Sequence, residues 1–313
     1  MSRKSCITAA AALVITVSLV SATWAADSEK VLYNFTNGDD GSLPDYSAMV
    51  LDKARNLYGV AGAGGTFGLG AVFELSPNAD GSWTETVLHS FAGGTDGAMP
   101  ENAGLVRDDA GNLYGVTMFG GGLGSCPIEG TNYYCGSVFE LSGGSSGKWQ
   151  ETILFRFDNG KLGGYPSDTL ILDHAGNLYG TAALGTGCGG GGCGMVFELA
   201  RSRESSWKEK ILYAFQGGDG AAPHSPLLFD SQGNVYGTTI SGGSNYAGVV
   251  FKLSPRKKGA WKETVLHNFD PLAYDGSRPC GVLAFDRGGN LYGSTHNGGK
   301  WPCGKYGPGC GVV

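Results

Sequence analysis

The chain has 313 residues, of which 56 are glycine, and only 16% of its residues are charged. A glycine content this high can accompany disorder, but aromatic residues make up 11% of the chain and recur in a fixed pattern. We therefore expect a folded, turn-rich β protein. The formal net charge is −6, which argues against nucleic acid as a partner because nucleic acid is bound largely through lysine and arginine.

Residues 1–25 are typical of an export signal. Arg3 and Lys4 precede an uncharged apolar run from Ile7 to Val20, and small residues lead to a cleavage position after Ala25. The run is shorter than the about 20 apolar residues of a membrane span, although an uncleaved N-terminal anchor stays the alternative. Without this segment 20 basic and 28 acidic residues remain, a net charge of −8. We expect a monomer that is secreted, periplasmic or at the cell surface, with no transmembrane segment in the mature chain.

A tandem repeat occupies the rest of the chain. The sequence Asn-Leu-Tyr-Gly, with one Val for Leu, occurs five times, and an aspartate lies four residues before each asparagine. The tyrosines are separated by 56, 65, 57 and 56 residues. They are Tyr58, Tyr114, Tyr179, Tyr236 and Tyr292. Five such copies predict repeated structural units.

Each unit is expected to contain four short strands. An apolar run ending in the aspartate, such as 170–173, is the first, and a Gly-Asn turn leads to the Leu-Tyr-Gly strand. The third strand is Val-Phe-Glu-Leu, as at 72–75, and the fourth opens with tryptophan, as at 83–91. Short strands bounded by turn residues indicate an all-β array. Four strands per repeat, with periodic glycine and aromatic positions, predict the blades of a β-propeller.

The two ends of the repeat region predict how the array closes. Residues 29–35 match a fourth strand and precede any first strand, whereas residues 280–313 supply a first strand, a second and the beginning of a third. We therefore predict five four-stranded blades, the last closed by the N-terminal strand so that no sheet edge is exposed. The sequence stops at Val313, one residue before an expected phenylalanine, so a truncated longer array is the alternative.

Residues 26–313 are expected to form one domain, with the closing strand at 29–35. The repeats lie at about 36–91, 92–157, 158–215, 216–269 and 270–313. The composite pattern is Val-Leu-His-x-Phe, Asp-Gly-x-x-Pro, Asp-x-x-Gly-Asn-Leu-Tyr-Gly, Val-Phe-Glu-Leu and Trp-x-Glu-Thr. This pattern resembles the GloVer tandem-repeat family of exported bacterial proteins. The resemblance implies an exported, surface-associated, propeller-like array, and it brings no catalytic residue.

Six cysteines fall as local pairs in the loop between the second and third strands of three units. The pairs are Cys126 with Cys135, Cys188 with Cys193, and Cys303 with Cys310. In an exported protein this recurrence predicts three loop-stapling disulfides. A zinc site is the weaker alternative because Cys-x-x-Cys spacing is lacking. Cys280 is left over, either as a small buried residue or as a thiol that exchanges with Cys303 or Cys310.

The Asp-Gly-x-x-Pro motif carries a carboxylate in four repeats. These are Asp40, Asp96, Asp219 and Asp275. As a functional group they could form a ring that binds a cation or a sugar, and as a structural group each would cap a turn leading to the proline. The turn is favoured because the motif is a repeat element and because Leu162 replaces the aspartate in the third repeat.

The fourth strand also carries a glutamate in four repeats. These are Glu85, Glu151, Glu209 and Glu263. Glycoside cleavage uses two carboxyl groups about 5–9.5 Å apart, but acids present in every blade are expected to be structural. His89 and His267 share a position with Tyr33, Phe155 and Tyr213, and are interpreted as packing residues. No catalytic residue, metal ion or cofactor is predicted.

Loops from the second to the third strand, and from the fourth strand to the next unit, are expected to share one face. The repeats diverge most there, and divergent loops on a rigid scaffold commonly carry binding sites. Aromatic side chains in these loops would suit a sugar face or a protein partner, or they pack on neighbouring loops. They are Phe119, Tyr133, Tyr134, Tyr246, Trp301 and Tyr306.

The leading interpretation is a non-enzymatic binding or surface-interaction module whose ligand is an unknown glycan or protein. The first alternative is a carbohydrate-active enzyme, a glycoside hydrolase or lyase, that uses acids outside the repeat pattern such as Glu101 or Glu129. The second alternative is a structural envelope or adhesion array.

Overall fold

The computed structural model places one compact unit at Tyr33–Val313. The residues it describes are 29–44, 48–101, 103–124, 126–128, 131–143, 147–158, 161–166, 168–185, 187–188, 192–202, 206–300 and 309–313. Regular structure in these ranges is β-strand apart from two short 3₁₀ turns, Lys257–Gly259 and Pro271–Ala273. The predicted all-β class is confirmed. No helix in the described part of the chain is long and apolar enough to cross a membrane.

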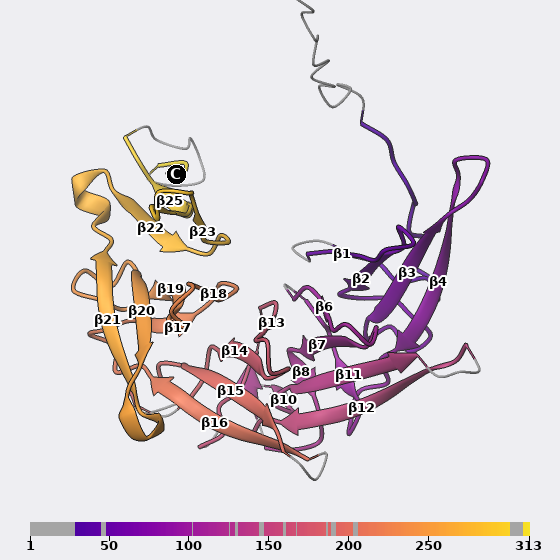
Figure 1. Cartoon of the computed structure of the whole chain (residues 1–313), viewed down its shortest axis with the longest axis horizontal. Helices are drawn as coiled ribbons and strands as arrows, with labels where there is room; N and C mark the ends of the chain where they lie inside the picture. The colour runs from indigo at the N-terminus through magenta and orange to yellow at the C-terminus, as the bar shows by residue number, and fades with distance from the viewer. Residues whose placement is uncertain are drawn as a thin grey trace, which may run out of the picture. The chain divides into compact units, whose positions relative to one another are not determined.

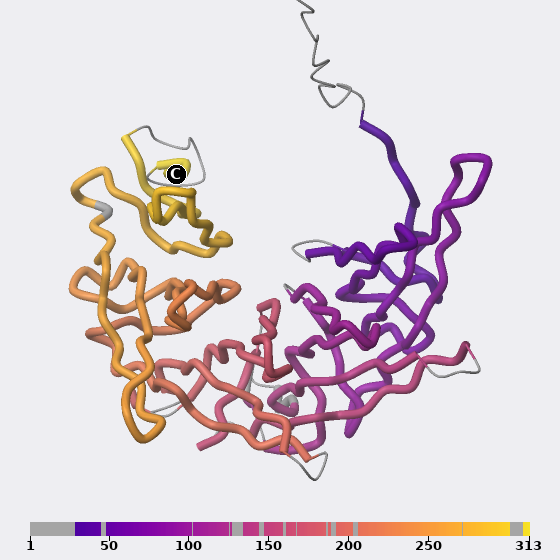
Figure 2. The backbone as a smooth tube through the Cα atoms, viewed as in Figure 1, coloured from indigo at the N-terminus to yellow at the C-terminus, as the bar shows by residue number. Residues whose placement is uncertain are grey.

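Four consecutive repeats each form an antiparallel sheet in the described ranges, with four strands that follow one another in chain order (Figure 1). The fourth sheet has a fifth strand, β17 (Ala221–Pro223), which also pairs with β19 (Val235–Ser241). Sheet 1 contains β1 (Val50–Leu51), β2 (Leu57–Ala61), β3 (Ala71–Pro77) and β4 (Trp83–Ser90). Sheet 2 contains β6 (Val106–Arg107), β7 (Leu113–Thr117), β11 (Ser137–Gly143) and β12 (Trp149–Arg156). Sheet 3 contains β13 (Ile171–Leu172), β14 (Leu178–Ala182), β15 (Met195–Arg201) and β16 (Trp207–Ala214). Sheet 4 contains β18 (Leu228–Phe229), β19 (Val235–Ser241), β20 (Val249–Pro255) and β21 (Trp261–Asn268). Each sheet comes from one continuous stretch of chain, as the colour gradient shows (Figure 2).

Shorter strands lie in the loops and in the fifth repeat. Loop strands are β5 (Gly97–Ala98) on β8 (Phe119–Gly120), β9 (Cys126–Ile128) on β10 (Thr131–Tyr133), and β17 (Ala221–Pro223) on β19. The fifth repeat contains β22 (Gly276–Pro279) paired with β25 (Thr295–Gly298), and β23 (Ala284–Phe285) paired with β24 (Leu291–Tyr292). The Thr295 amide donates to the Val312 carbonyl at 2.9 Å. This bond matches the pairing of Thr239 with Val249 in sheet 4, as expected for the beginning of a third strand.

The Asp-x-x-Gly-Asn-Leu-Tyr-Gly motif is a single hydrogen-bonded unit. Asp52 accepts from the Asn56 backbone amide at 2.8 Å, and from the Asn56 side-chain amide and the Tyr58 hydroxyl at 3.2 Å. The same three bonds recur in the later repeats at Asp108, Asp173, Asp230 and Asp286. The aspartate therefore fixes the turn between the first two strands, as the sequence predicts.

The glycine of Leu-Tyr-Gly lets the core close. A Cβ atom on Gly59 would lie 2.7 Å from the ring of Phe73 in the third strand, and 2.6 Å separates the equivalent positions at Gly115, Gly180 and Gly237. The facing phenylalanines are completely buried. They are Phe73, Phe139, Phe197 and Phe251. A glycine is needed at this position because the aromatic ring fills the space of its side chain.

Aromatic pairs join each sheet to the next. Phe91, which follows β4, lies edge-on against Phe139 of sheet 2 with ring centroids 5.2 Å apart. The corresponding distances are 5.5 Å for Phe157–Phe197 and 5.1 Å for Phe215–Phe251. Phe35 lies in the same way against Phe73 of sheet 1, at 4.9 Å. Residues 33–35 therefore contact sheet 1 as the end of a fourth strand contacts each later sheet.

The closing strand is not formed in the described residues. Residues 29–35 and 309–313 carry no strand assignment. Among the described residues, no ladder joins the two segments. Five blades and a closed ring thus stay predictions.

The predicted disulfides are confirmed for Cys126–Cys135 and Cys188–Cys193. Cys310 is disulfide-bonded, and its predicted partner Cys303 lies outside the described residues. Cys280 carries a free thiol and is exposed. Of its two interpretations, the buried small residue is wrong, because the loop after Pro279 leaves it at the surface.

Candidate functional site

The aspartates of the Asp-Gly-x-x-Pro motif make local turn contacts. Asp40 accepts from the Thr36 amide at 2.8 Å, Asp96 from the Ala92 amide at 2.7 Å, and Asp219 from the Gln216 amide at 2.7 Å. Asp275 accepts from the amide of Gly276 at 2.8 Å. Each carboxylate therefore holds the turn that follows a fourth strand, and this matches the structural alternative for the motif.

A side chain two residues before the fourth-strand phenylalanine provides a second donor to each of these aspartates. Tyr33 donates to Asp40 at 3.0 Å, and the His89 Nε2 atom lies 3.3 Å from Asp96. Tyr213 bonds Asp219, and His267 lies 2.7 Å from Asp275. The interpretation of His89 and His267 as packing residues is incomplete, because both also contact a carboxylate.

The junction of sheets 2 and 3 lacks both members of this pair. Phe155 stands where the other repeats have tyrosine or histidine, and Leu162 stands where they have aspartate. Asp158 takes over the turn by accepting from the Leu162 amide at 3.0 Å. The tyrosine or histidine donor and the aspartate acceptor are therefore absent from the same junction, where either of them alone would lack its partner.

Each fourth-strand glutamate lies beside a turn aspartate at the beginning of its own repeat. Burial raises the pKa of each glutamate, and the charge of a neighbouring aspartate adds to it: Asp40 beside Glu85, Asp158 beside Glu209 and Asp219 beside Glu263. For Glu151 the hydrogen bond with Asp96 comes second and the charge of Asp96 third. The pKa reaches about 8 for Glu151 and about 7 for Glu209 and Glu263. In the described part of the chain, the Oε1 atom of each of the four is buried with no hydrogen-bond partner. Acid clusters therefore form at the junctions of consecutive sheets.

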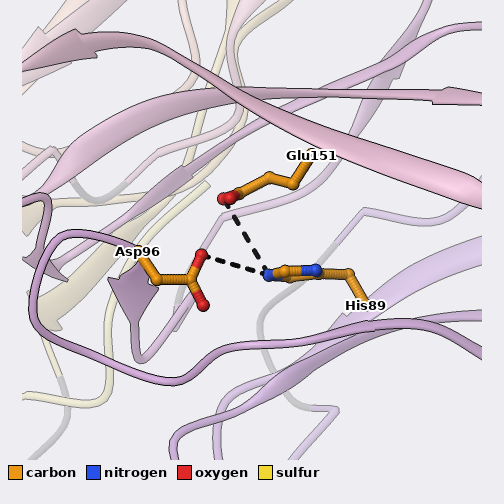
Figure 3. Close-up of side chains that lie close together, drawn as sticks. All are labelled: His89, Asp96 and Glu151. Atoms are coloured by element: carbon orange, nitrogen blue, oxygen red, sulfur yellow. Dashed lines mark hydrogen bonds and ion pairs between the residues drawn. The ribbon is translucent and has the colours of Figure 1, made fainter.

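One of these clusters contains a histidine with both acids. His89 lies on β4, Asp96 in the loop after it, and Glu151 on β12 of sheet 2. The His89 Nε2 atom is 3.3 Å from Asp96 and 3.9 Å from Glu151, and it points toward both carboxylates (Figure 3). The three side chains are mostly buried, with exposed fractions of 22%, 19% and 14%.

The loop aromatics do not form one described surface. For Phe119 the packing alternative holds, since it is 8% exposed and packs edge-on against Tyr165 at 5.5 Å. Phe119 and Tyr134 line one cavity of about 250 Å³, and Tyr246 is 84% exposed. The side chain of Tyr133 and all of Trp301, Tyr306 and Glu129 lie outside the described residues.

A second group of polar residues follows the proline of the Asp-Gly-x-x-Pro motif, at the entry to each first strand. Asp168, His224 and Cys280 lie in three consecutive entry loops, and we call them the entry-loop cluster. The Asp168 Oδ1 atom lies 3.7 Å from His224 Nδ1. Its Oδ2 atom accepts from the Thr181 hydroxyl at 3.1 Å. Sheet 3 thus holds the acid, and the next entry loop supplies the imidazole.

Threonine 238 of β19 joins the other two loops of the cluster. The amide of His224 donates to the Thr238 carbonyl at 3.3 Å, and the Thr238 hydroxyl donates to the Pro279 carbonyl at 3.0 Å. Cys280 follows this proline directly. The carbonyl and the hydroxyl of Thr238 therefore position the loops that carry His224 and Cys280.

The electrostatics of the cluster follow from burial. Asp168 is 6% exposed, and burial raises the pKa of its carboxyl to about 6, although the charge of His224 and the Thr181 bond act in the opposite direction. Burial also raises the pKa of the Cys280 thiol; Arg278 opposes this and the charge of Asp168 adds to it. A carboxyl group that titrates near neutral pH thus lies beside a half-buried imidazole.

The sequence pattern does not predict the entry-loop cluster, because His224 has no partner at ligand spacing and Asp168 lies outside the repeated motifs. A signal was nevertheless present. The residue after the repeated proline is Asp45, Glu101, Ser167, His224 and Cys280 in turn, so a fixed place in the repeat carries a different polar side chain each time. Glu101 lies against Gly62 at the end of sheet 1.

The comparisons with known proteins concern fold and family. A gluconolactonase from Xanthomonas campestris is similar in structure at 15% identity, with a TM-score of 0.45 over 78% of this chain and 68% of that chain. An α-L-arabinofuranosidase from Clostridium thermocellum is similar at 14% identity, with a TM-score of 0.43 over 80% of each chain. At these scores neither likeness defines the fold or the function. No curated protein matches the chain.

The sequence itself is similar to a described repeat family. The model of the Gloeobacter/Verrucomicrobia repeat matches residues 125–306, more than half of the chain. This range includes the turn motif of repeats three to five, and the third-strand motif and fourth-strand tryptophan of repeats two to four. The chain therefore belongs to the Gloeobacter/Verrucomicrobia repeat family.

Proposed function

We propose that this chain is an exported, β-propeller-type binding module that takes a carbohydrate ligand at the entry-loop cluster. The observation that carries the proposal is the meeting of Asp168 and His224 from different repeats. His224 directly follows the repeated proline and Asp168 lies two residues after it, and at both places the residue differs in every repeat, whereas the repeated aspartates are engaged in turns. Carboxylate and imidazole groups accept and donate the hydrogen bonds that sugar hydroxyls require.

Export is part of the same proposal. Residues 1–25 would be removed as a signal peptide, and the disulfides Cys126–Cys135 and Cys188–Cys193 are consistent with an oxidising compartment. Intact-mass measurement of the exported protein, with and without reduction, tests both points. A mature chain that still begins at Met1 would contradict export by cleavage.

The binding test uses the full mature chain and a panel of mono- and oligosaccharides. Isothermal titration should detect a ligand that His224→Ala binds at least tenfold more weakly, because the imidazole partner of Asp168 is lost. His174→Ala is the matched control, since His174 is an exposed histidine in the turn of the third repeat. Equal affinities of the two variants would rule out the entry-loop cluster as the binding site.

Ring closure by the N-terminal segment completes the proposed architecture. It is supported by Phe35, which contacts Phe73 as Phe91 contacts Phe139. By the register of β20 and β21, in which Val249 lies opposite Asn268, a closed ring places Asn34 opposite Val312.

A cysteine pair tests this register. Asn34→Cys with Val312→Cys, in a Cys280→Ser background, should form an intramolecular disulfide that intact mass and proteolytic mapping detect. Val249→Cys with Asn268→Cys is the positive control, because these residues lie opposite each other in sheet 4. A link in the control pair alone would contradict closure.

A carbohydrate-active enzyme is the second candidate, favoured by one observation. The pKa of Asp168 is raised to about 6, which suits a group that exchanges protons near neutral pH. Release of reducing ends from a polysaccharide panel, lost in Asp168→Asn while sugar binding is retained, would establish this activity. Binding without turnover by the wild-type chain would favour the binding module.

A further inference from the structure

The junction of sheets 1 and 2 brings together the ligand atoms of a metal site. The His89 Nε2 atom and one carboxylate oxygen each from Asp96 and Glu151 all lie within 4.8 Å of one another. They come from the fourth strand of one sheet, the loop after it and the fourth strand of the next sheet. No other such group occurs among the residues that the structure describes.

The distances fit coordination. Zinc binds imidazole nitrogen and carboxylate oxygen at about 2.0–2.2 Å, which separates neighbouring ligand atoms by about 3–3.5 Å. The nitrogen–oxygen distances here are 3.3 Å and 3.9 Å. Small side-chain shifts would therefore be enough to bind an ion.

The cluster also contains a buried oxygen atom that no described group of the protein hydrogen-bonds. The Glu151 Oε1 atom is buried without a hydrogen-bond partner, and a buried polar oxygen without a partner is costly. The His89 ring is held in place by Phe91, edge-on with centroids 4.8 Å apart. A cation between the three groups would satisfy Glu151 without moving the histidine ring.

The sister junctions show what distinguishes this one. Tyr33 and Tyr213 occupy the position of His89 in the clusters of Glu85 and Glu263, and Phe155 occupies it beside Glu209. A neutral phenol is a much poorer zinc ligand than imidazole, and a phenyl ring offers no ligand atom. His89 therefore turns a repeated acid pair into a mixed nitrogen–oxygen donor set.

We propose that His89, Asp96 and Glu151 bind a divalent transition-metal ion, zinc by preference, and that the ion joins sheet 1 to sheet 2. An imidazole with two carboxylates suits zinc rather than magnesium or calcium, which favour all-oxygen sites. Three protein ligands leave a fourth position for water.

The test measures zinc binding to the full mature chain after treatment with a chelator. Titration calorimetry should give one zinc ion per chain, and thermal unfolding should shift upward with zinc. His89→Tyr should weaken binding at least tenfold, and it is expected to fold because tyrosine occupies this position in two sister clusters. Glu151→Gln, which keeps the shape of the side chain, should also weaken it.

His267→Tyr is the matched control, because His267 holds the same repeat position beside Asp275 but belongs to no described three-ligand group. It should bind zinc as the wild type does. Absence of binding by the wild type, or equal binding by the wild type and His89→Tyr, would overturn the proposal. A calcium-induced shift that His89→Tyr retains would also overturn it.

Discussion

At the scale of single residues, the repeats keep a side-chain contact to the turn aspartate although the residue type that makes it changes. Tyrosine or histidine bonds the turn aspartate of four repeats, and Phe155 and Leu162 replace the two partners at the junction of sheets 2 and 3. The sequence predicted the aspartate as a turn residue because its spacing to glycine and proline is local. It could not predict the tyrosine or histidine as its partner, because that contact depends on how the turn folds back onto the strand.

Arg55 occupies the turn position that glycine holds in the other repeats, with φ of 71° against 96°, 81°, 76° and 83° at the glycines. A left-handed backbone costs an L-residue about 1–2 kcal/mol, and glycine gives back about 0.5–1 kcal/mol through its freer unfolded state. Arg55→Gly should therefore raise the free energy of unfolding by about 0.5–1 kcal/mol. Urea denaturation measures the change.

Gly176→Arg is the reverse experiment. A Cβ atom on Gly176 would have no neighbour within 4 Å, and its φ is 81°. The only expected effect is backbone strain, so stability should fall by about the amount that Arg55→Gly gains. Neutral results for both variants would mean that the turn relaxes freely.

At the scale of elements, the second and third strands of each of the four sheets pack together because a glycine of one strand faces a phenylalanine ring of the other. Gly115 faces Phe139, and a Cβ atom would lie 2.6 Å from the ring and 3.0 Å from Leu105. Sequence periodicity predicted both strands, but it did not predict the bulge that shifts the register beside each such phenylalanine. A bulge depends on how the paired strands twist together.

Gly115→Ala should lower the stability by about 1–3 kcal/mol, because Phe139 and Leu105 are buried and cannot move aside. The change is measured as the urea midpoint at unaltered slope. Gly218→Ala serves as the control, since nothing lies within 4 Å of its Cβ position. A loss of similar size at Gly218 would show that the clash with the Phe139 ring is not the cause of the lower stability.

At the scale of the whole molecule, acids gather at the junctions between sheets. Glu209 and Glu263 come from different repeats, and burial followed by a neighbouring aspartate raises the pKa of each to about 7. The folded chain therefore holds these protons more tightly than the unfolded chain, in which the pKa is about 4.3. Their contribution to stability is complete below the unfolded value and declines as the pH rises toward 7.

Thermal unfolding should accordingly show a lower melting temperature at pH 8 than at pH 5.5. Glu209→Gln with Glu263→Gln should reduce this difference, because the amide stays neutral at both pH values. Asp109→Asn changes an exposed acid and should leave the difference as it is. An unchanged pH dependence in the double variant would contradict protonated glutamates at the junctions.

The sequence alone determined the repeat, the strand order, the turn motif and the disulfide pairs Cys126–Cys135 and Cys188–Cys193. All of these depend on residues close together along the chain, where spacing limits which backbone conformations and pairings are possible. Only the tertiary structure decided that Asp168 meets His224, that His89 meets Glu151, and that Phe119 is buried. Such contacts join different sheets or loops, and they depend on the packing between units rather than on any local pattern.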